Sequence, residues 1–160
     1  MAISGDGNVI VAGAMYLEDN AGGVYVFVRG DGTWAGWSEA KLLTAETPAS
    51  GDYLGVSVAI SYNGRVIAAG AYEYNSANGA VYVFVKGDNE WLERPNNFET
   101  VILTEIVPAT EAGAYLGCSV AISSDGSVIA AGASDFMDTQ NGLDDQGAVY
   151  VANSGNIWPK

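Results

Sequence analysis

Four aspartates that lie close together in the sequence are the residues best able to hold a cation. They are Asp135, Asp138, Asp144 and Asp145. Carboxylate oxygens are ligands that Ca²⁺ prefers, so this cluster could form a weak calcium site. Paired carboxylates could also act as acid and base in a hydrolysis. The simpler interpretation, which the sequence favours, is that all four are solvated charges on a surface loop.

Catalysis has little support elsewhere in the chain. There is no histidine, which removes the usual proton shuttle at neutral pH and the commonest activator of a nucleophile. The one cysteine, Cys118, occupies a place where the preceding repeat has Val56. We therefore interpret it as a small buried hydrophobe rather than a reactive thiol. No glycine-rich phosphate loop opens a helix. We expect a protein that is not an enzyme and has no organic cofactor.

Aromatic side chains are the second set that could bind a ligand. Trp34, Trp91 and Trp158 recur at matching places in three related segments. Rings repeated in this way could stack on sugars, as in a lectin. Large aromatics more often pack inside a protein, and a recurring tryptophan is most simply a wedge between adjacent repeats. The same choice applies to Tyr53 and Tyr115. In both cases the sequence favours packing and leaves glycan binding as the alternative.

One segment that occurs three times fixes the positions of all these residues. It reads AISGDGNVIVAGA at 2–14, AISYNGRVIAAGA at 59–71 and AISSDGSVIAAGA at 121–133, and a run containing VYV follows each copy. Such a series is an array of one supersecondary unit. The Asp-Gly or Asn-Gly pair in each copy predicts a tight hairpin turn with positive φ at both of its central residues.

A complete unit is expected to form four antiparallel strands. In the second copy these are 57–61, 66–71, 81–87 and about 100–106, and no helical periodicity is visible. In the third strand, aromatic and β-branched residues on alternate positions leave no polar face, so both faces of the sheet should be covered. The first unit lacks most of its first strand, and the third unit ends before a fourth.

These features indicate an all-β fold made of β-propeller blades rather than a sandwich. We expect a single domain over 1–160, with repeats at 1–50, 51–112 and 113–160. An isolated stack of three blades would expose an apolar sheet face at each end. We therefore expect copies to associate head to tail, as a closed ring or a filament. Alternatively, the chain is a fragment of a longer repeat protein.

The net charge narrows the range of partners. Nineteen acidic and six basic residues give a formal charge of −13, which would repel a phosphate backbone or an anionic lipid surface. The apolar runs, about five to seven residues long, are too short to span a bilayer. We expect neither nucleic acid binding nor membrane insertion. We read no targeting signal in the sequence.

Two short motifs give the unit a family resemblance. Leu54-Gly55 and Leu116-Gly117 stand where FG-GAP repeats have Phe-Gly, and residues 69–71 and 131–133 stand where those repeats have Gly-Ala-Pro. The chain thus resembles FG-GAP repeats, the blades of integrin α-subunit propellers, over nearly its whole length. The resemblance implies a propeller with an interaction or adhesion role, extracellular or at the cell surface. Its partners would be other copies of itself, other proteins or glycans.

Two departures from the family limit what the resemblance implies. Calcium-binding members carry an Asp-rich loop between the first two strands of a blade, whereas each copy here has at most one carboxylate in that turn. A single carboxylate cannot supply the six to eight oxygen ligands of calcium, so we do not expect that site. Family propellers close with about seven blades, and this chain carries three incomplete ones.

Overall fold

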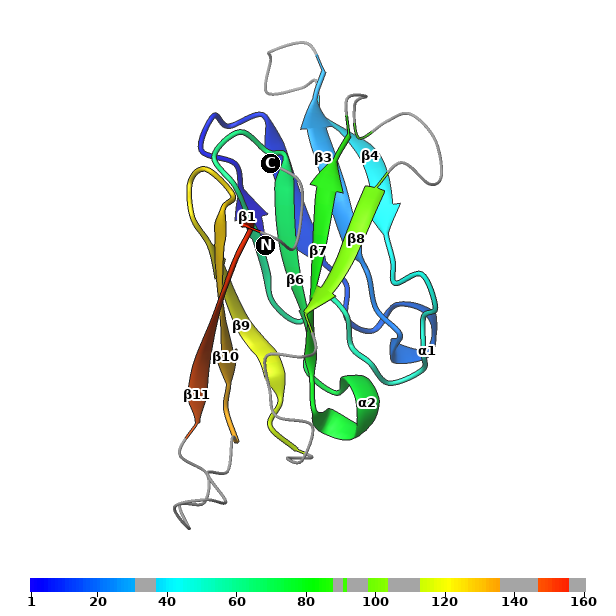
Figure 1. Ribbon diagram of the computed structural model, residues 1–160. Coiled ribbons are helices and arrows are strands. Elements are labelled where there is room, and N and C mark those ends of the chain that lie inside the picture. The colour runs from blue at the N-terminus through cyan, green and yellow to red at the C-terminus, as the bar shows by residue number, and fades with distance from the viewer. Residues whose placement is uncertain (31–36, 88–90, 92–97, 104–112, 136–146, 156–160) are drawn as a thin grey trace.

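Three antiparallel sheets stand next to one another, with the second sheet between the other two (Figure 1). The computed structural model describes residues 1–30, 37–87, 91, 98–103, 113–135 and 147–155. Each sheet is formed by one of the three sequence units, and hydrogen bonds join its strands in antiparallel register. The expected all-β fold is therefore confirmed.

The strand order within each sheet follows the chain. The first sheet is β1 (Ala2–Ile3), β2 (Val9–Gly13), β3 (Val24–Arg29) and β4 (Trp37–Leu43). The second is β5 (Val58–Ile60), β6 (Val66–Ala71), β7 (Ala80–Lys86) and β8 (Phe98–Leu103). The third is β9 (Leu116–Ile122), β10 (Val128–Ala133) and β11 (Ala148–Asn153). Strand β8 begins two residues before the fourth strand predicted for the second unit. Among the described residues, the third sheet has three strands.

Two four-residue turns connect the second and third strands of the first two sheets. They are α1 (Leu17–Asn20) and α2 (Tyr74–Ala77). Both contain consecutive left-handed residues, with φ values of 45° and 58° at Glu18 and Asp19 and similar values in α2. These turns are too short to carry a helical periodicity, which explains why the sequence shows none. No helix in the part of the chain that the structure describes is long enough to cross a membrane.

The second sheet is apolar on both faces. The side chains that pack against the first sheet are Ile67, Ala69, Ala71, Ala80, Tyr82 and Phe84. Those that pack against the third sheet are Val66, Ala68, Val81, Val83 and Val85. All of them are buried. The alternation follows from the two-residue period of a strand, and it confirms the expectation that both sides of this sheet are covered.

Glycines allow the backbones of adjacent sheets to come very close together. A Cβ atom on Gly70 would overlap the carbonyl oxygen of Gly117, and one on Gly13 would overlap that of Gly55. The glycines of strands β2 and β6 therefore lie directly against the Leu-Gly motif of the next unit. This contact explains why a small residue is needed at the end of the second strand in the first two repeats.

Substituting Gly70→Val should destabilise the protein by about 3 kcal/mol, because the added side chain would force the second and third sheets apart. Urea denaturation measures the change. The matched control is Ala49→Val, at an exposed loop position, which should change stability by less than about 0.5 kcal/mol. Equal stabilities for the two variants would contradict the close approach of the backbones.

Candidate interaction surface

The outward face of the third sheet is apolar and open to solvent. Val149 is 73% exposed, Val151 is 64% exposed and Val128 is 38% exposed. Their counterparts in the second unit are Val81, Val83 and Val66, which are buried against the third sheet. We call Val128, Val149 and Val151 the valine face. It repeats a surface that is covered elsewhere in the same molecule.

The outward face of the first sheet carries the same residue types as the face of the second sheet that packs against the first sheet. Ile10, Tyr25 and Phe27 are half-buried there, whereas their counterparts Ile67, Tyr82 and Phe84 are at most 1% exposed. The aromatic pair keeps its spacing, with ring centroids 6.5 Å apart for Tyr25 and Phe27 and 6.4 Å apart for Tyr82 and Phe84. We call Ile10, Tyr25 and Phe27 the aromatic face.

Hydrogen bonds between sheets show how stacked units align. The backbone N–H of Asp6 donates to Tyr62 O at 3.1 Å, and the N–H of Tyr62 donates to Ser124 O at 2.8 Å. The Ser57 hydroxyl donates to Gly117 O at 2.7 Å. The turns between the first two strands thus form a continuous hydrogen-bonded row across all three sheets. This row fixes the register in which one unit packs on the next.

The Leu-Gly motif forms a second set of bonds between neighbouring units. Leu54 forms a parallel bridge with Gly22, and Leu116 forms the same bridge with Gly79. The residue before each leucine, Tyr53 or Tyr115, is left-handed, with a φ of 56° or 54°. These tyrosine N–H groups donate to Asn20 O and Ala77 O, both at 2.9 Å. Each unit therefore docks its Leu-Gly segment onto the left-handed turn of the preceding unit.

The turn between the first two strands is held by a serine and an Asp or Asn. In the first unit, Asp6 Oδ1 accepts from the Ser4 hydroxyl at 2.6 Å and from the N–H of Asn8 at 3.0 Å. The same contacts recur at Asn63 and Asp125. The prediction of positive φ at both central residues is wrong, because only the glycine, such as Gly7, is left-handed. Hydrogen bonds to the side-chain Oδ1 of the Asp or Asn stabilise the turn instead.

Hydrogen bonds strongly favour the ionised form of Asp125. The Ser123 hydroxyl and then the backbone and hydroxyl of Ser127 lower the pKa of Asp125 to about 2. An aspartate with a lowered pKa stabilises the fold above its usual value near 3.8, and this contribution is lost as the pH falls through about 2.

The variant Asp125→Asn keeps the turn, because the second unit carries Asn63 at this place. It should melt below the wild-type protein at pH 5, and the difference should shrink as the pH is lowered to about 2. Thermal melts followed by circular dichroism over this pH range provide the measurement. A difference in melting temperature that stays constant over the range would contradict the lowered pKa.

Of the three recurring tryptophans, Trp91 lies within the described residues. It is fully buried in the core between the first and second sheets, and its Nε1–H donates to Gly64 O at 3.0 Å. A ring with no exposed face has no surface on which a sugar could stack, so this placement favours packing. Trp34 and Trp158 lie outside the described residues, and their part in glycan binding stays a prediction.

Replacing Trp91 with phenylalanine should cost about 1–3 kcal/mol, because the variant loses packed volume and leaves Gly64 O without this donor. Chemical denaturation measures the loss. Tyr62→Phe is the control, since Tyr62 is 57% exposed and its substitution should have little effect. If the two variants were equally stable, Trp91 would not be the wedge that its position indicates.

Of the four clustered aspartates, the described residues include Asp135. It is exposed, and Asp138, Asp144 and Asp145 lie outside the described residues. Within the described part of the chain, no group of three or more His, Cys, Asp or Glu could hold a metal ion. Calcium binding at this loop therefore stays a prediction. Cys118 is half-buried rather than fully buried, and its thiol contacts Gly132 O at 3.4 Å.

The FG-GAP repeat family matches the chain at residues 37–84. This stretch runs from β4 through most of β7 and contains Leu54-Gly55, so it confirms the family resemblance there. No curated protein matches the chain significantly. A repeat of this family indicates an interaction or adhesion module of the integrin type.

Proposed function

We propose, starting from the FG-GAP repeat at residues 37–84, that the chain is a non-enzymatic interaction module of propeller blades that binds copies of itself. The observation that carries the proposal is the exposure of the valine face. Val149 and Val151 are open to solvent, although Val81 and Val83 at the same places in the second unit have no exposed surface. A contiguous apolar surface of this kind is typical of an association site.

The two outward faces suggest how the copies join. Inside the molecule, adjacent sheets pack through unlike faces. The face that is equivalent to the valine face packs on the face of the next sheet that carries the counterpart of Ile10. The valine face of one copy can therefore pack on the aromatic face of another and repeat an interface that the chain already forms twice. Such a contact joins unlike surfaces, so it produces a ring if the rotation closes and a filament if it does not.

The polar groups at the two ends support the same arrangement. The N–H of Tyr62 donates to Ser124 O on the next unit. Gly5, Tyr62 and Ser124 occupy the same place in the three units. The equivalent donor at the outer side of the third unit is therefore the N–H of Ser124, and the equivalent acceptor at the outer side of the first unit is Gly5 O. Head-to-tail packing would bring this donor and acceptor together and continue the hydrogen-bonded row.

The setting we propose is extracellular or at the cell surface, where FG-GAP repeats are typically found. An adhesion or scaffold role follows from a repeat that binds through its faces and loops. Self-association is the function that the described residues support, because Trp91 is buried and no group of metal-ligating side chains forms among the residues that the structure describes.

Replacing Val149 and Val151 with glutamate should break the association, because the charges would be buried at the contact without partners. Light scattering coupled to size exclusion should give multiples of the 16.6 kDa chain mass for the wild type and the single chain mass for the variant. The matched control places the same charges at Thr47 and Ala49, which are exposed loop residues. A wild-type protein that stays monomeric at high concentration would defeat the proposal.

A further inference from the structure

Four tyrosines form a continuous row at the end of the molecule that carries α1 and α2. They are Tyr16, Tyr53, Tyr72 and Tyr115, and successive ring centroids lie 6.1, 5.5 and 5.9 Å apart. Tyr16 is 70% exposed, and the other three are half-buried. None belongs to either core cluster. The row crosses all three units, and packing of the core does not account for it.

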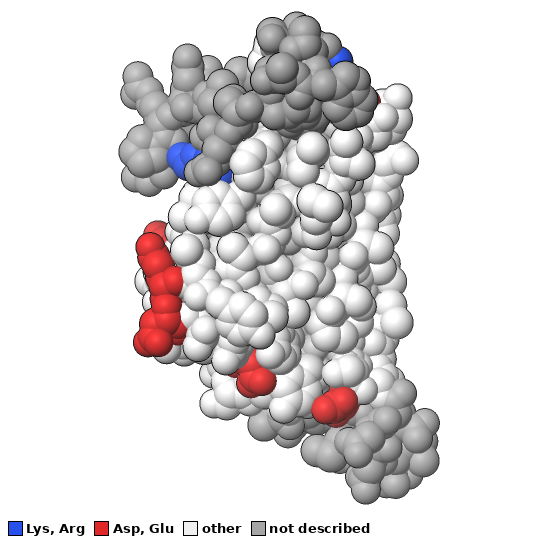
Figure 2. Space-filling view, turned by 180° about the vertical axis from the view of Figure 1, so that it is seen from behind, with Lys and Arg blue, Asp and Glu red and all other residues white. Residues whose placement is uncertain are grey.

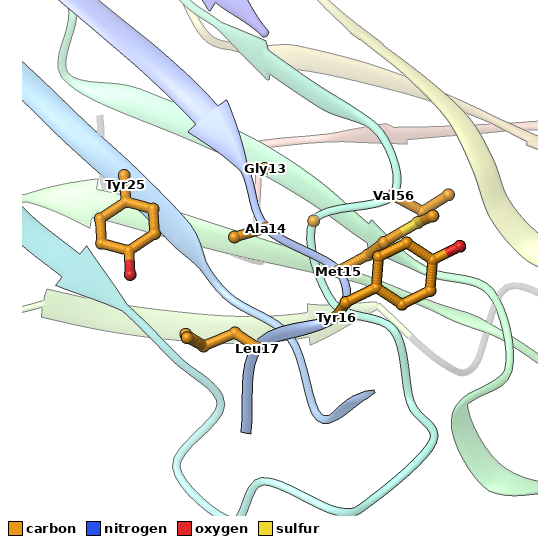
Figure 3. A pocket seen from close by; sticks show the side chains of 8 residues that line it. Gly13, Ala14, Met15, Tyr16, Leu17, Tyr25 and Val56 are labelled. Atoms are coloured by element: carbon orange, nitrogen blue, oxygen red, sulfur yellow. The ribbon is translucent and has the colours of Figure 1, made fainter. Parts of the chain in front are cut away.

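Shallow hollows lie along the row. One, of about 410 Å³, is lined by Met15, Tyr16 and Val56 among others, and Figure 3 shows Tyr16 beside Met15 and Val56. A second, of about 320 Å³, is lined by Val56, Tyr72, Tyr115, Cys118, Ser134 and Asp135. Because Val56 lines both, the hollows adjoin and form an apolar groove with tyrosines along it. The left-handed backbones of Tyr53 and Tyr115 are held by hydrogen bonds, so the groove is preformed.

The surroundings of the groove are acidic. In Figure 2, most of the acidic surface on the visible face lies in the middle and lower parts of the view, and the basic side chains lie near the top. The described carboxyl residues that reach the surface in the connections at the α1 and α2 end are Glu18, Asp19, Glu46, Glu73 and Asp135. The described residues of those connections include no lysine or arginine. This end of the molecule therefore attracts a positively charged partner.

The geometry of the rings indicates the shape of that partner. The ring of Tyr72 is tilted by 33° to the rings of Tyr53 and Tyr115, and Tyr16 stands at 86° to Tyr53. The row is therefore not a flat platform on which a sugar ring could stack. Partial burial, then Glu73 and the other tyrosines of the row, raise the pKa of Tyr72. Its hydroxyl therefore remains a hydrogen-bond donor at neutral pH.

A polyproline II segment has the complementary chemistry. Its backbone makes no internal hydrogen bonds, so its carbonyls are free to accept from tyrosine hydroxyls. Its proline rings fit hollows between aromatic side chains, and the segment is already extended, so little entropy is lost on binding. We propose that the tyrosine row and its groove bind a proline-rich segment of another protein that carries lysine or arginine. This site goes beyond self-association. None of its tyrosines belongs to the valine face or the aromatic face, although Tyr25 of the aromatic face also lines the first hollow.

The test is fluorescence anisotropy at physiological salt with a labelled peptide of sequence PPKPPRPPK. The charge-matched control peptide is AAKAARAAK. The proline peptide should bind at least threefold more tightly, because charge attraction alone is the same for both. Tyr72→Leu should weaken its binding roughly three- to tenfold, and Tyr72→Phe should weaken it less. Tyr62→Leu, at an exposed tyrosine outside the row, should leave the affinity within about twofold.

Several results would overturn this inference. They are equal binding of the two peptides, no binding of either, or an equal effect of Tyr62→Leu. Binding of cellohexaose in place of the peptide, with the same dependence on Tyr72, would overturn it in favour of a glycan site. If Tyr72→Leu fails to fold by circular dichroism, Tyr16→Ala replaces it, because Tyr16 is largely exposed. Peptide binding is compared only between samples that have the same assembly mass. Failure of this site can then be distinguished from failure of self-association.

Discussion

A β-sheet that is apolar on both faces must be covered on both faces, and the rest of this structure follows from that constraint. Strand β7 has no polar face from Ala80 to Val85, so the second sheet is stable only between two others. The first and third sheets supply this cover, and each presents an apolar surface of its own on the far side. The stack therefore ends in two surfaces of the kind that it buries inside.

The backbone contacts between units depend on the same stacking. Gly13 and Gly70 bring adjacent backbones together, and the Leu-Gly segments add parallel bridges to the preceding turn. Tyr53 and Tyr115 adopt left-handed conformations that are uncommon for bulky residues. These conformations place successive tyrosines side by side along the rim. A feature required by stacking therefore also builds the tyrosine row on the surface.

Much of this fold could be predicted from the repeated segment. Its three copies predicted the three sheets, and the unbroken apolar pattern of Val81 to Val85 predicted a sheet buried on both sides. The conformation of the turns could not be predicted, because it depends on the hydrogen bonds that Asp6, Asn63 and Asp125 make with nearby serines. A dipeptide pattern does not reveal those bonds.

The surface features were harder to predict than the core. Sequence reasoning favoured a structural role for Tyr53 and Tyr115 but did not place Tyr16 or Tyr72 beside them, because these residues come from separate loops that only the stacking brings together. The tryptophan pattern predicted a wedge or a ligand site, and only the position of Trp91 in the core favours the wedge. The aspartates clustered in the sequence did not reveal whether their oxygens converge.

The central claim is that each apolar sheet face is covered by the next sheet, whether within the chain or from another copy. Hydrogen exchange followed by mass spectrometry at several protein concentrations tests this claim most directly. The account predicts slow exchange in β7 at every concentration, and exchange in β11 that slows as the concentration is raised. Exchange in β11 that is equally fast at all concentrations would contradict it, because the exposed valine face would then need no cover.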